Sequence, residues 1–199
     1  MLLITALICS LVWLIGKWGT VRIDYLDRQR MSWRKGAVGE ALVARTLETL
    51  PNDFVVINDV TKRFSNIDHV VIGPTGVYVI DTKNWKGTVK TDGKGELLAN
   101  DRPPSKPAIK AMVGSVMDFQ NKIKALVGKD YFVRGLMVFP IAYLEANFGA
   151  TGHIHCLRDG QLVDYIQNKT FARSLRRDDI DRIKRAALQL AGMDERFKA

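Results

Sequence analysis

The chain has 199 residues, enough for one ordinary domain or for a domain with an appendage. Its composition, 47% hydrophobic and 26% charged, excludes wholesale disorder, and its two cysteines exclude a disulfide scaffold and a multi-cysteine zinc module. A total of 30 Lys and Arg against 21 Asp and Glu gives a formal net charge of +9, which favours a polyanionic partner such as nucleic acid or anionic lipid.

The chain begins with an apolar stretch in which only Thr5 and Ser10 of the first fifteen residues are not apolar. A helix extended to Val21 would measure about 31 Å, close to the ~30 Å of a bilayer's hydrocarbon core. A cleaved signal peptide is disfavoured because no basic residue precedes Lys17, and a buried core helix because the stretch has no polar face. We therefore expect a transmembrane anchor over residues 1–21.

Basic residues follow this apolar stretch and none precedes it; they are Lys17, Arg22, Arg28, Arg30, Arg34 and Lys35. The positive-inside rule then places the rest of the chain in the cytoplasm. We expect a single-pass protein of the inner, cytoplasmic membrane, with residues 22–35 as a basic juxtamembrane linker that also attracts anionic headgroups.

The first elements after the linker are a helix and three strands. Apolar residues recur at spacings of three and four from Gly36 to Leu50, which predicts a helix that Pro51 and Asn52 end. Residues 54–59 are a short β-rich run. Residues 67–73 and 77–83 predict two strands of an antiparallel hairpin, joined by a turn rich in Gly and Pro.

The later elements alternate between helices and strands. A second hairpin is predicted around Asp92-Gly93, and a helix over residues 107–127. Residues 135–140 form a continuous apolar run of the buried kind. A further strand at 154–157 and a helix at 161–168 complete one α/β domain with a mixed sheet.

The C-terminal residues 169–199 contain an amphipathic basic helix between Asp178 and Ala191. Two interpretations remain open for it. The helix either packs on the domain or contacts a membrane or nucleic acid through its basic face.

Two aspartates and a lysine lie at the open end of the predicted hairpin. Asp68 starts one strand and Asp81 ends the other, so the two are expected to be neighbours, and Lys83 shares a face with Asp81. Adjacent carboxylates repel unless a cation lies between them, and hard oxygen ligands suit Mg²⁺ or Mn²⁺. Metal, water and lysine together suit phosphodiester hydrolysis, whereas the alternative from spacing alone is two strand-end acids and a surface lysine.

Three ordered blocks of sequence carry a resemblance to a known family. Gly36-Ala37-x-Gly39-Glu40, then residues 67–73 and then residues 76–87 closely resemble the nuclease-related domain family, NERD, which is grouped with the PD-(D/E)xK nuclease superfamily. The resemblance covers roughly residues 36–168. It implies a restriction-endonuclease-like mixed sheet flanked by helices, and nuclease activity.

The resemblance also implies roles for individual residues. Glu40 would be the helical acid that helps to hold a metal, Asp68 and Asp81 the two further acids, and Lys83 the catalytic lysine. The backbone carbonyl of Thr82 would be a further metal ligand.

Three positions depart from the family's pattern. Ile67 replaces the superfamily's proline, and Asp81 stands where the family more often has glutamate. Residues 106–110 replace an Asn-Pro-x-x-Gln stretch, which leaves Lys110 rather than glutamine to contact phosphate.

The segment after these motifs is rich in basic residues. Lys86 and Lys90 are among those that would line a groove for a phosphate backbone, or would form a solvated surface. Trp85 would either stack on a base or pack beneath the hairpin. His69 is expected to be structural, and the His153-Ile154-His155-Cys156 run lacks the second cluster that a zinc site needs.

These features lead to one functional hypothesis and one alternative. The hypothesis is a membrane-anchored, cytoplasm-facing nuclease that depends on Mg²⁺, or Mn²⁺, and acts as an endonuclease, with DNA favoured over RNA through the resemblance alone. The alternative is a catalytically silent, membrane-tethered module that binds nucleic acid or protein. The expected division is an anchor at 1–21, a linker at 22–35, a nuclease domain at 36–168 and a helical tail at 169–199.

Overall fold

The computed structural model describes Trp13, Lys17, Trp18, Arg30 and Met31, and the ranges 33–61, 66–145, 154–168 and 174–192. The chain divides into two compact units, Met1–Val38 and Gly39–Ala199. Within the described residues, no helix has the length and apolar character needed to cross a bilayer. The anchor expected over residues 1–21 falls almost entirely outside the described residues.

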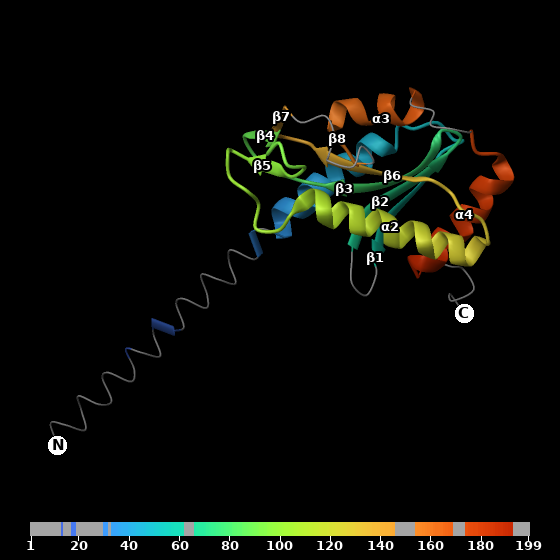
Figure 1. Cartoon of the computed structure of the whole chain (residues 1–199), viewed down its shortest axis with the longest axis horizontal. Coiled ribbons are helices and arrows are strands. Elements are labelled where there is room, and N and C mark those ends of the chain that lie inside the picture. The colour runs from blue at the N-terminus through green and yellow to red at the C-terminus, as the bar shows by residue number, and fades with distance from the viewer. Residues whose placement is uncertain are drawn as a thin grey trace, which may run out of the picture. The chain divides into compact units, whose positions relative to one another are not determined.

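A five-stranded mixed sheet forms the centre of the second unit (Figure 1). Its strands are β1 (Val55–Thr61), β2 (Asn66–Gly73), β3 (Gly76–Thr82), β6 (Val133–Phe139) and β8 (Ile154–Arg158), in the spatial order β1-β2-β3-β6-β8. The first three strands are antiparallel, and β6 and β8 add in parallel to β3. The predicted α/β fold with a mixed sheet is confirmed.

The sequence of each strand agrees with its place in the sheet. All seven residues of β6 are buried, because this strand has a neighbour on either side and helices on both faces. The β2–β3 turn closes at the pair Gly73 and Gly76, and Gly76 has a φ of +146°, which side chains rarely tolerate. The predicted hairpin therefore forms with its turn where the sequence indicated.

Helices cover both faces of this sheet. Residues 33–47 are helical, and α2 (Ala108–Val127), α3 (Asp159–Asn168) and α4 (Arg177–Leu190) follow. Phe119 of α2 and Ile183 of α4 pack into the core on one face. On the other face, Leu47 of the first helix and Leu162 of α3 pack with Tyr78. Figure 1 shows α2 and α3 on opposite sides of the sheet.

A second, three-stranded sheet follows the hairpin directly. It consists of β4 (Thr88–Thr91), β5 (Leu97–Ala99) and β7 (Tyr143–Leu144), in the order β5-β4-β7. The predicted turn around Asp92-Gly93 joins β4 to β5. Glu96 in this turn region accepts the backbone N–H groups of Ile109 and Lys110 at 3.0 and 2.8 Å, so it caps the start of α2.

Several element boundaries differ from the sequence prediction. The first helix starts earlier and ends at residue 47, and β3 ends at Thr82, so Lys83 lies just beyond the strand. β7 was not predicted, because two residues carry no periodic pattern and their pairing with β4 is a tertiary contact. Of the two interpretations of the C-terminal helix, the structure shows packing: Ile180, Ile183 and Ala187 of α4 are buried in the core.

Candidate active site

The register of the hairpin brings Asp68 and Asp81 to opposite positions. The ladder between β2 and β3 ends at the pair His69 and Ile80, and one further step along the same register sets Asp68 against Asp81. The Asp68 carboxylate also accepts the backbone N–H of Thr82 at 2.6 Å. The structure therefore places the two acids side by side at the open end of the hairpin, as predicted.

Lys83 completes this arrangement from the residue after β3. Its Nζ lies 2.7 Å from Oδ2 of Asp81, and both side chains are about a quarter exposed, at 29% and 24%. Its backbone N–H donates to the carbonyl oxygen of Val138 on β6 at 2.8 Å. The lysine is thus held by the sheet although it lies outside the strand, and its ammonium group stays accessible.

Glu40 reaches the same region from the first helix. Gly39 allows this approach, because a Cβ atom at residue 39 would lie 2.8 Å from Cβ of Asn84, well inside a normal contact distance. Burial raises the pKa of Glu40, and the negative charges of Asp59 and Asp81 raise it further. Glu40 therefore shares an electrostatic environment with the hairpin acids.

The carboxylates of the site repel one another. Burial raises the pKa of Asp68 to about 7, and the neighbouring charge of Asp81 adds to this shift, while the N–H of Thr82 opposes it. A carboxylate with such a pKa is half protonated at neutral pH in the absence of a compensating cation. The donor set of Asp68 and Asp81 is one that a divalent cation would stabilise.

The structure adds Asp59, which the sequence analysis did not identify. The pairs Asn58–His69 and Val60–Ile67 flank it, so Asp59 stands opposite Asp68 in register, although the two form no ladder pair. Its φ of +54° is a left-handed conformation that aspartate tolerates better than most residues. The only signal in the sequence was its place at the end of an apolar run.

Three aspartates thus lie in one row across β1, β2 and β3. Among the residues that the structure describes, however, no group of three or more His, Cys, Asp or Glu side chains is close enough to hold a metal ion. The structure therefore brings together some, but not all, of the residues predicted to hold a metal. Asp68 and Asp81 are adjacent, and Glu40 is an electrostatic neighbour whose role as a ligand stays a prediction.

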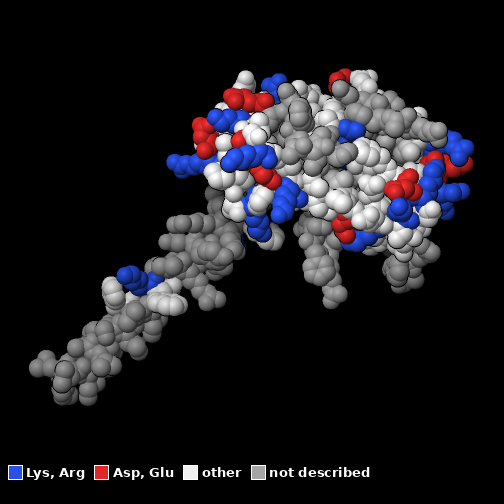
Figure 2. Space-filling model, viewed as in Figure 1, with Lys and Arg blue, Asp and Glu red and all other residues white. Residues whose placement is uncertain are grey.

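The four residues predicted to contact nucleic acid have different surroundings in the structure. Trp85 packs edge-to-face on Phe139, with ring centroids 5.6 Å apart, so of the two roles considered the structure shows the packing one. Lys86 is exposed, Lys90 forms an ion pair with Asp101, and Lys110 is exposed in the first turn of α2. Figure 2 shows Lys and Arg side chains at both ends of the domain, and at the end that carries β4 and β5 in Figure 1 acidic side chains stand among them.

Three other side chains have potential chemistry: His69 and His155 are hydrogen-bonded, and Cys156 is buried. His69 is 3% exposed, its Nδ1 lies 2.9 Å from Oδ1 of Asn58, and burial lowers its pKa to about 4. His155 bonds to Arg134, while burial raises the pKa of the Cys156 thiol to about 12. His69 is neutral at pH 7 and structural, in agreement with the prediction.

The fold and this site define an α/β protein with a mixed sheet, which carries an acidic pair and a lysine at the open end of a hairpin. The chain matches the nuclease-related domain family, NERD, over residues 35–140, more than half of its length, and it belongs to that family.

A relative in Bacillus anthracis, described as an uncharacterized protein, is 43% identical over 61 residues. The match covers 28% of this chain and 29% of that protein, so it spans less than a third of the relative's length.

Two solved structures show low similarity. A repair endonuclease from Pyrococcus abyssi has 18% identity and a TM-score of 0.29, over 58% of this chain and 42% of its own. SfsA from Pyrococcus furiosus, in complex with Ca²⁺, has 14% identity and a TM-score of 0.26, over 80% and 54%. At these TM-scores the likeness carries no argument about the activity of this chain.

Proposed function

We propose that this protein is a metal-dependent nuclease that hydrolyses phosphodiester bonds, with DNA as its substrate. The observation that carries the proposal is the convergence of Asp68, Asp81 and Lys83. The hairpin register sets the two acids opposite each other, and Lys83 lies 2.7 Å from Asp81. Membership of a nuclease-related family supports the same chemistry.

Mg²⁺ or Mn²⁺ is the cofactor that suits this donor set. Asp68 and Asp81 would hold it, with the carbonyl oxygen of Thr82 and the carboxylate of Glu40 as further ligands. The raised pKa of Asp68 supports this assignment, because burial and the charge of Asp81 raise it, and a divalent cation would offset both effects. When bound, the cation would lower the pKa of a water molecule and neutralise charge on the phosphate.

The chain's own groups would carry the remaining steps of the reaction. The oxygen of a water molecule attacks phosphorus in line and the water gives up a proton to solvent; the bond from phosphorus to the leaving oxygen breaks, and that oxygen takes up a proton from solvent. Lys83 orients the attacking water and stabilises negative charge on the phosphoryl oxygens. The ion pair with Asp81 positions the ammonium group for both tasks.

The basic surface beside the site supports a nucleic-acid substrate. Lys86 lies three residues after Lys83, and Lys110 is exposed in the first turn of α2, whose residues Ala108 and Ala111 line a small cavity with Asp81 and Lys83. Side chains in these places would contact phosphates on either side of the scissile bond. Lys90 would contribute by breaking its ion pair with Asp101 and binding a phosphate instead.

We further propose that the apolar N-terminal segment anchors the protein in the cytoplasmic membrane, with the nuclease domain in the cytoplasm. The proposal rests on the length and apolar character of residues 1–21 and on the basic residues after them. A tethered nuclease would act on DNA near the membrane.

Cleavage of supercoiled plasmid by the full chain tests the nuclease. We expect nicked and linear products with Mg²⁺ or Mn²⁺, none with EDTA, and none from Asp81→Asn. Asp118→Asn is the matched control, because Asp118 is a partly exposed aspartate of α2 that also pairs with a lysine, Lys122, but lies outside the acidic row. Metal-independent cutting, or equal cutting by Asp81→Asn, would refute the assigned site. DNA binding without cutting would favour the silent binding module.

A further inference from the structure

A small cavity of about 160 Å³ lies directly beside Asp81 and Lys83. One of its walls comes from β2, β3 and the residue after β3, and the other comes from α2. In liquid water each molecule takes up about 30 Å³, so the cavity has room for roughly five groups of that size. This is enough for a phosphate group, whereas pockets for whole small molecules usually measure roughly 300–1,000 Å³.

The α2 wall of this cavity is apolar except for one residue. Its residues recur at spacings of three and four, so they share one face of the helix; they are Ala108, Ala111, Met112 and Ser115. The short side chains of the alanines leave space next to Asp81 and Lys83. Ser115 is the one polar side chain that α2 contributes to the wall.

The hydroxyl of Ser115 is available to a ligand. The side chain is partly buried, and within the part of the chain that the structure describes its hydroxyl forms no hydrogen bond. A serine inside a helix often donates to the carbonyl oxygen four residues before it, which here would be that of Ala111. Because that bond is not formed, Ser115 can donate to a group in the cavity without losing a partner.

The backbone at the start of α2 is already hydrogen-bonded. The N–H groups of Ile109 and Lys110 donate to the carboxylate of Glu96 at 3.0 and 2.8 Å, so they are not free to bind an anion. Of the side chains that line the cavity, Lys83 on one wall and Ser115 on the other are those that can donate to an anion. The two walls therefore offer an ammonium group and a hydroxyl to the same space.

We propose that Ser115 binds the scissile phosphate of the substrate. Its hydroxyl donates a hydrogen bond to a non-bridging oxygen, while the ammonium group of Lys83 approaches the phosphate from the opposite wall. Hydrogen bonds to charged acceptors are the stronger ones, so this contact holds the phosphate in position for in-line attack. The inference rests on the proposed nuclease function and adds a substrate-binding residue to the same site.

Cleavage of a defined DNA duplex by the full chain, measured as kcat/KM, tests the inference. Ser115→Ala should lower kcat/KM roughly 10- to 100-fold, the loss of one hydrogen bond to a charged group, without lowering the melting temperature. Asn121→Ala is the matched control, because Asn121 is an exposed polar residue of α2 outside the cavity wall. It should cleave like the unaltered chain.

A phosphorothioate substrate shows whether the hydroxyl contacts the phosphate itself. Sulfur in place of the contacted oxygen accepts a hydrogen bond poorly, so it should slow the unaltered chain more than it slows Ser115→Ala. The two changes should therefore be non-additive for one of the two diastereomers. Additive effects for both diastereomers would assign Ser115 a merely structural role and overturn the inference.

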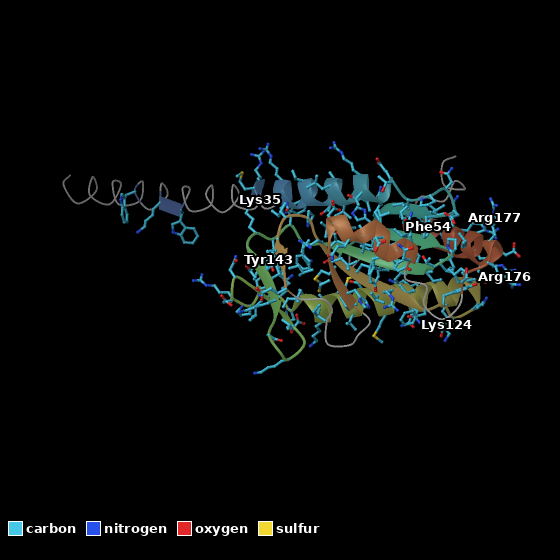
Figure 3. All side chains as sticks on the ribbon, turned by 90° about the horizontal axis from the view of Figure 1, so that it is seen from above. Lys35, Phe54, Lys124, Tyr143, Arg176 and Arg177 are labelled. Carbon is cyan, nitrogen blue, oxygen red and sulfur yellow. The ribbon has the colours of Figure 1, made fainter. Side chains whose placement is uncertain are left out.

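Filling the cavity tests whether the substrate needs this space. Ala111→Leu should reduce cleavage roughly tenfold or more, because the larger side chain occupies the position of the phosphate. Ala125→Leu is the matched control. Ala125 is exposed on α2 and adjoins Lys124, which Figure 3 shows at the end of the domain away from Tyr143.

Failure of the inference and failure of the proposed function give different results. If the unaltered chain cuts DNA with Mg²⁺ and either Ser115→Ala or Ala111→Leu cuts equally well, the inference is wrong and the nuclease assignment is retained. If the unaltered chain does not cut, the proposed function and the inference are both refuted.

Discussion

At the scale of single residues, the ion pair of Lys83 and Asp81 connects the fold to the proposed chemistry. The lysine lies beyond the end of β3, yet its backbone bond to Val138 holds it in place. Because this bond uses the main chain, the side chain can be altered without disturbing the sheet. A change of the Lys83 side chain should therefore affect activity without affecting stability.

Replacing Lys83 with alanine should abolish plasmid cleavage, with a loss of roughly 10²–10³-fold or more, because the charge that stabilises the phosphoryl oxygens is removed. The melting temperature should change little. Lys94→Ala is the control, since Lys94 is exposed in the β4–β5 turn. Cleavage retained by Lys83→Ala would contradict the role given to this lysine.

Asp68 should lower the stability of the metal-free protein at high pH. Its pKa is about 7 in the folded chain and about 3.9 in an unfolded one, so the folded state binds the proton more tightly. The free energy of unfolding therefore falls as pH rises from about 4 to about 7, and the whole penalty is present above that range. Asp68→Asn removes the ionisation and keeps an oxygen that can accept the N–H of Thr82.

Thermal unfolding in EDTA, compared at pH 5 and pH 8, measures this effect. The stabilisation of Asp68→Asn relative to the unaltered chain should be larger at pH 8. Added Mg²⁺ should stabilise the unaltered chain at pH 8 but not the variant, because the cation needs the ionised carboxylate. An advantage of the variant that is the same at both pH values would show that Asp68 is not the group responsible.

At the scale of elements, the site depends on how closely the first helix approaches the segment after β3. Gly39 and Asn84 meet there, one residue before Glu40 and one after Lys83. The glycine in the first motif is therefore explained by packing. Its small size sets the position from which Glu40 acts on the hairpin acids.

Gly39→Ala should destabilise the protein by about 1–3 kcal/mol, the usual cost of forcing an atom into a packed contact. It should also reduce cleavage, because the helix must move and takes Glu40 with it. Gly114→Ala is the matched control within α2, where an added Cβ meets nothing within 4 Å. There the same change should stabilise by roughly 0.5–1 kcal/mol. Chemical denaturation measures both, and equal effects would refute the packing argument.

At the scale of the whole molecule, the two ends of the central sheet carry different groups of side chains. The acidic row lies at one end, beside the small sheet and its lysines. A cavity lined by Arg134 and Arg176 lies at the other end, between the β2–β3 turn and the segment leading into α4. The parallel alignment of β3 with β6 brings residues 81–83 together with Val138 at the first end and Tyr78 together with Arg134 nearer the second.

The N-terminal segment yields a prediction about the whole chain. The full chain should float with lipid vesicles and remain bound in roughly 1 M NaCl, where charges are screened within about 3 Å. A chain that starts at Arg22 should bind only anionic vesicles, through the basic linker, and should dissociate at this salt concentration. Release of the full chain by salt would mean that residues 1–21 do not anchor it.

The sequence by itself determined much of the fold and the centre of the site. The apolar run of β6, the helical spacing of α2 and the turn after Gly73 each identified their element, because each is a local pattern of residues. Hairpin geometry also predicted the neighbouring positions of Asp68 and Asp81. Antiparallel pairing around a known turn leaves no other register.

Only the tertiary structure decided which other residues lie with Asp68 and Asp81. Asp59 joins the acidic row because β1 pairs with β2, and no local pattern of residues reveals the register of that pairing. Packing against Phe139 decided between the two roles of Trp85, and burial of Ile183 decided between those of the C-terminal helix. The cavity lined by Arg134 and Arg176 likewise joins three segments that are distant in the sequence, because contacts between elements arise from the packing of the whole core.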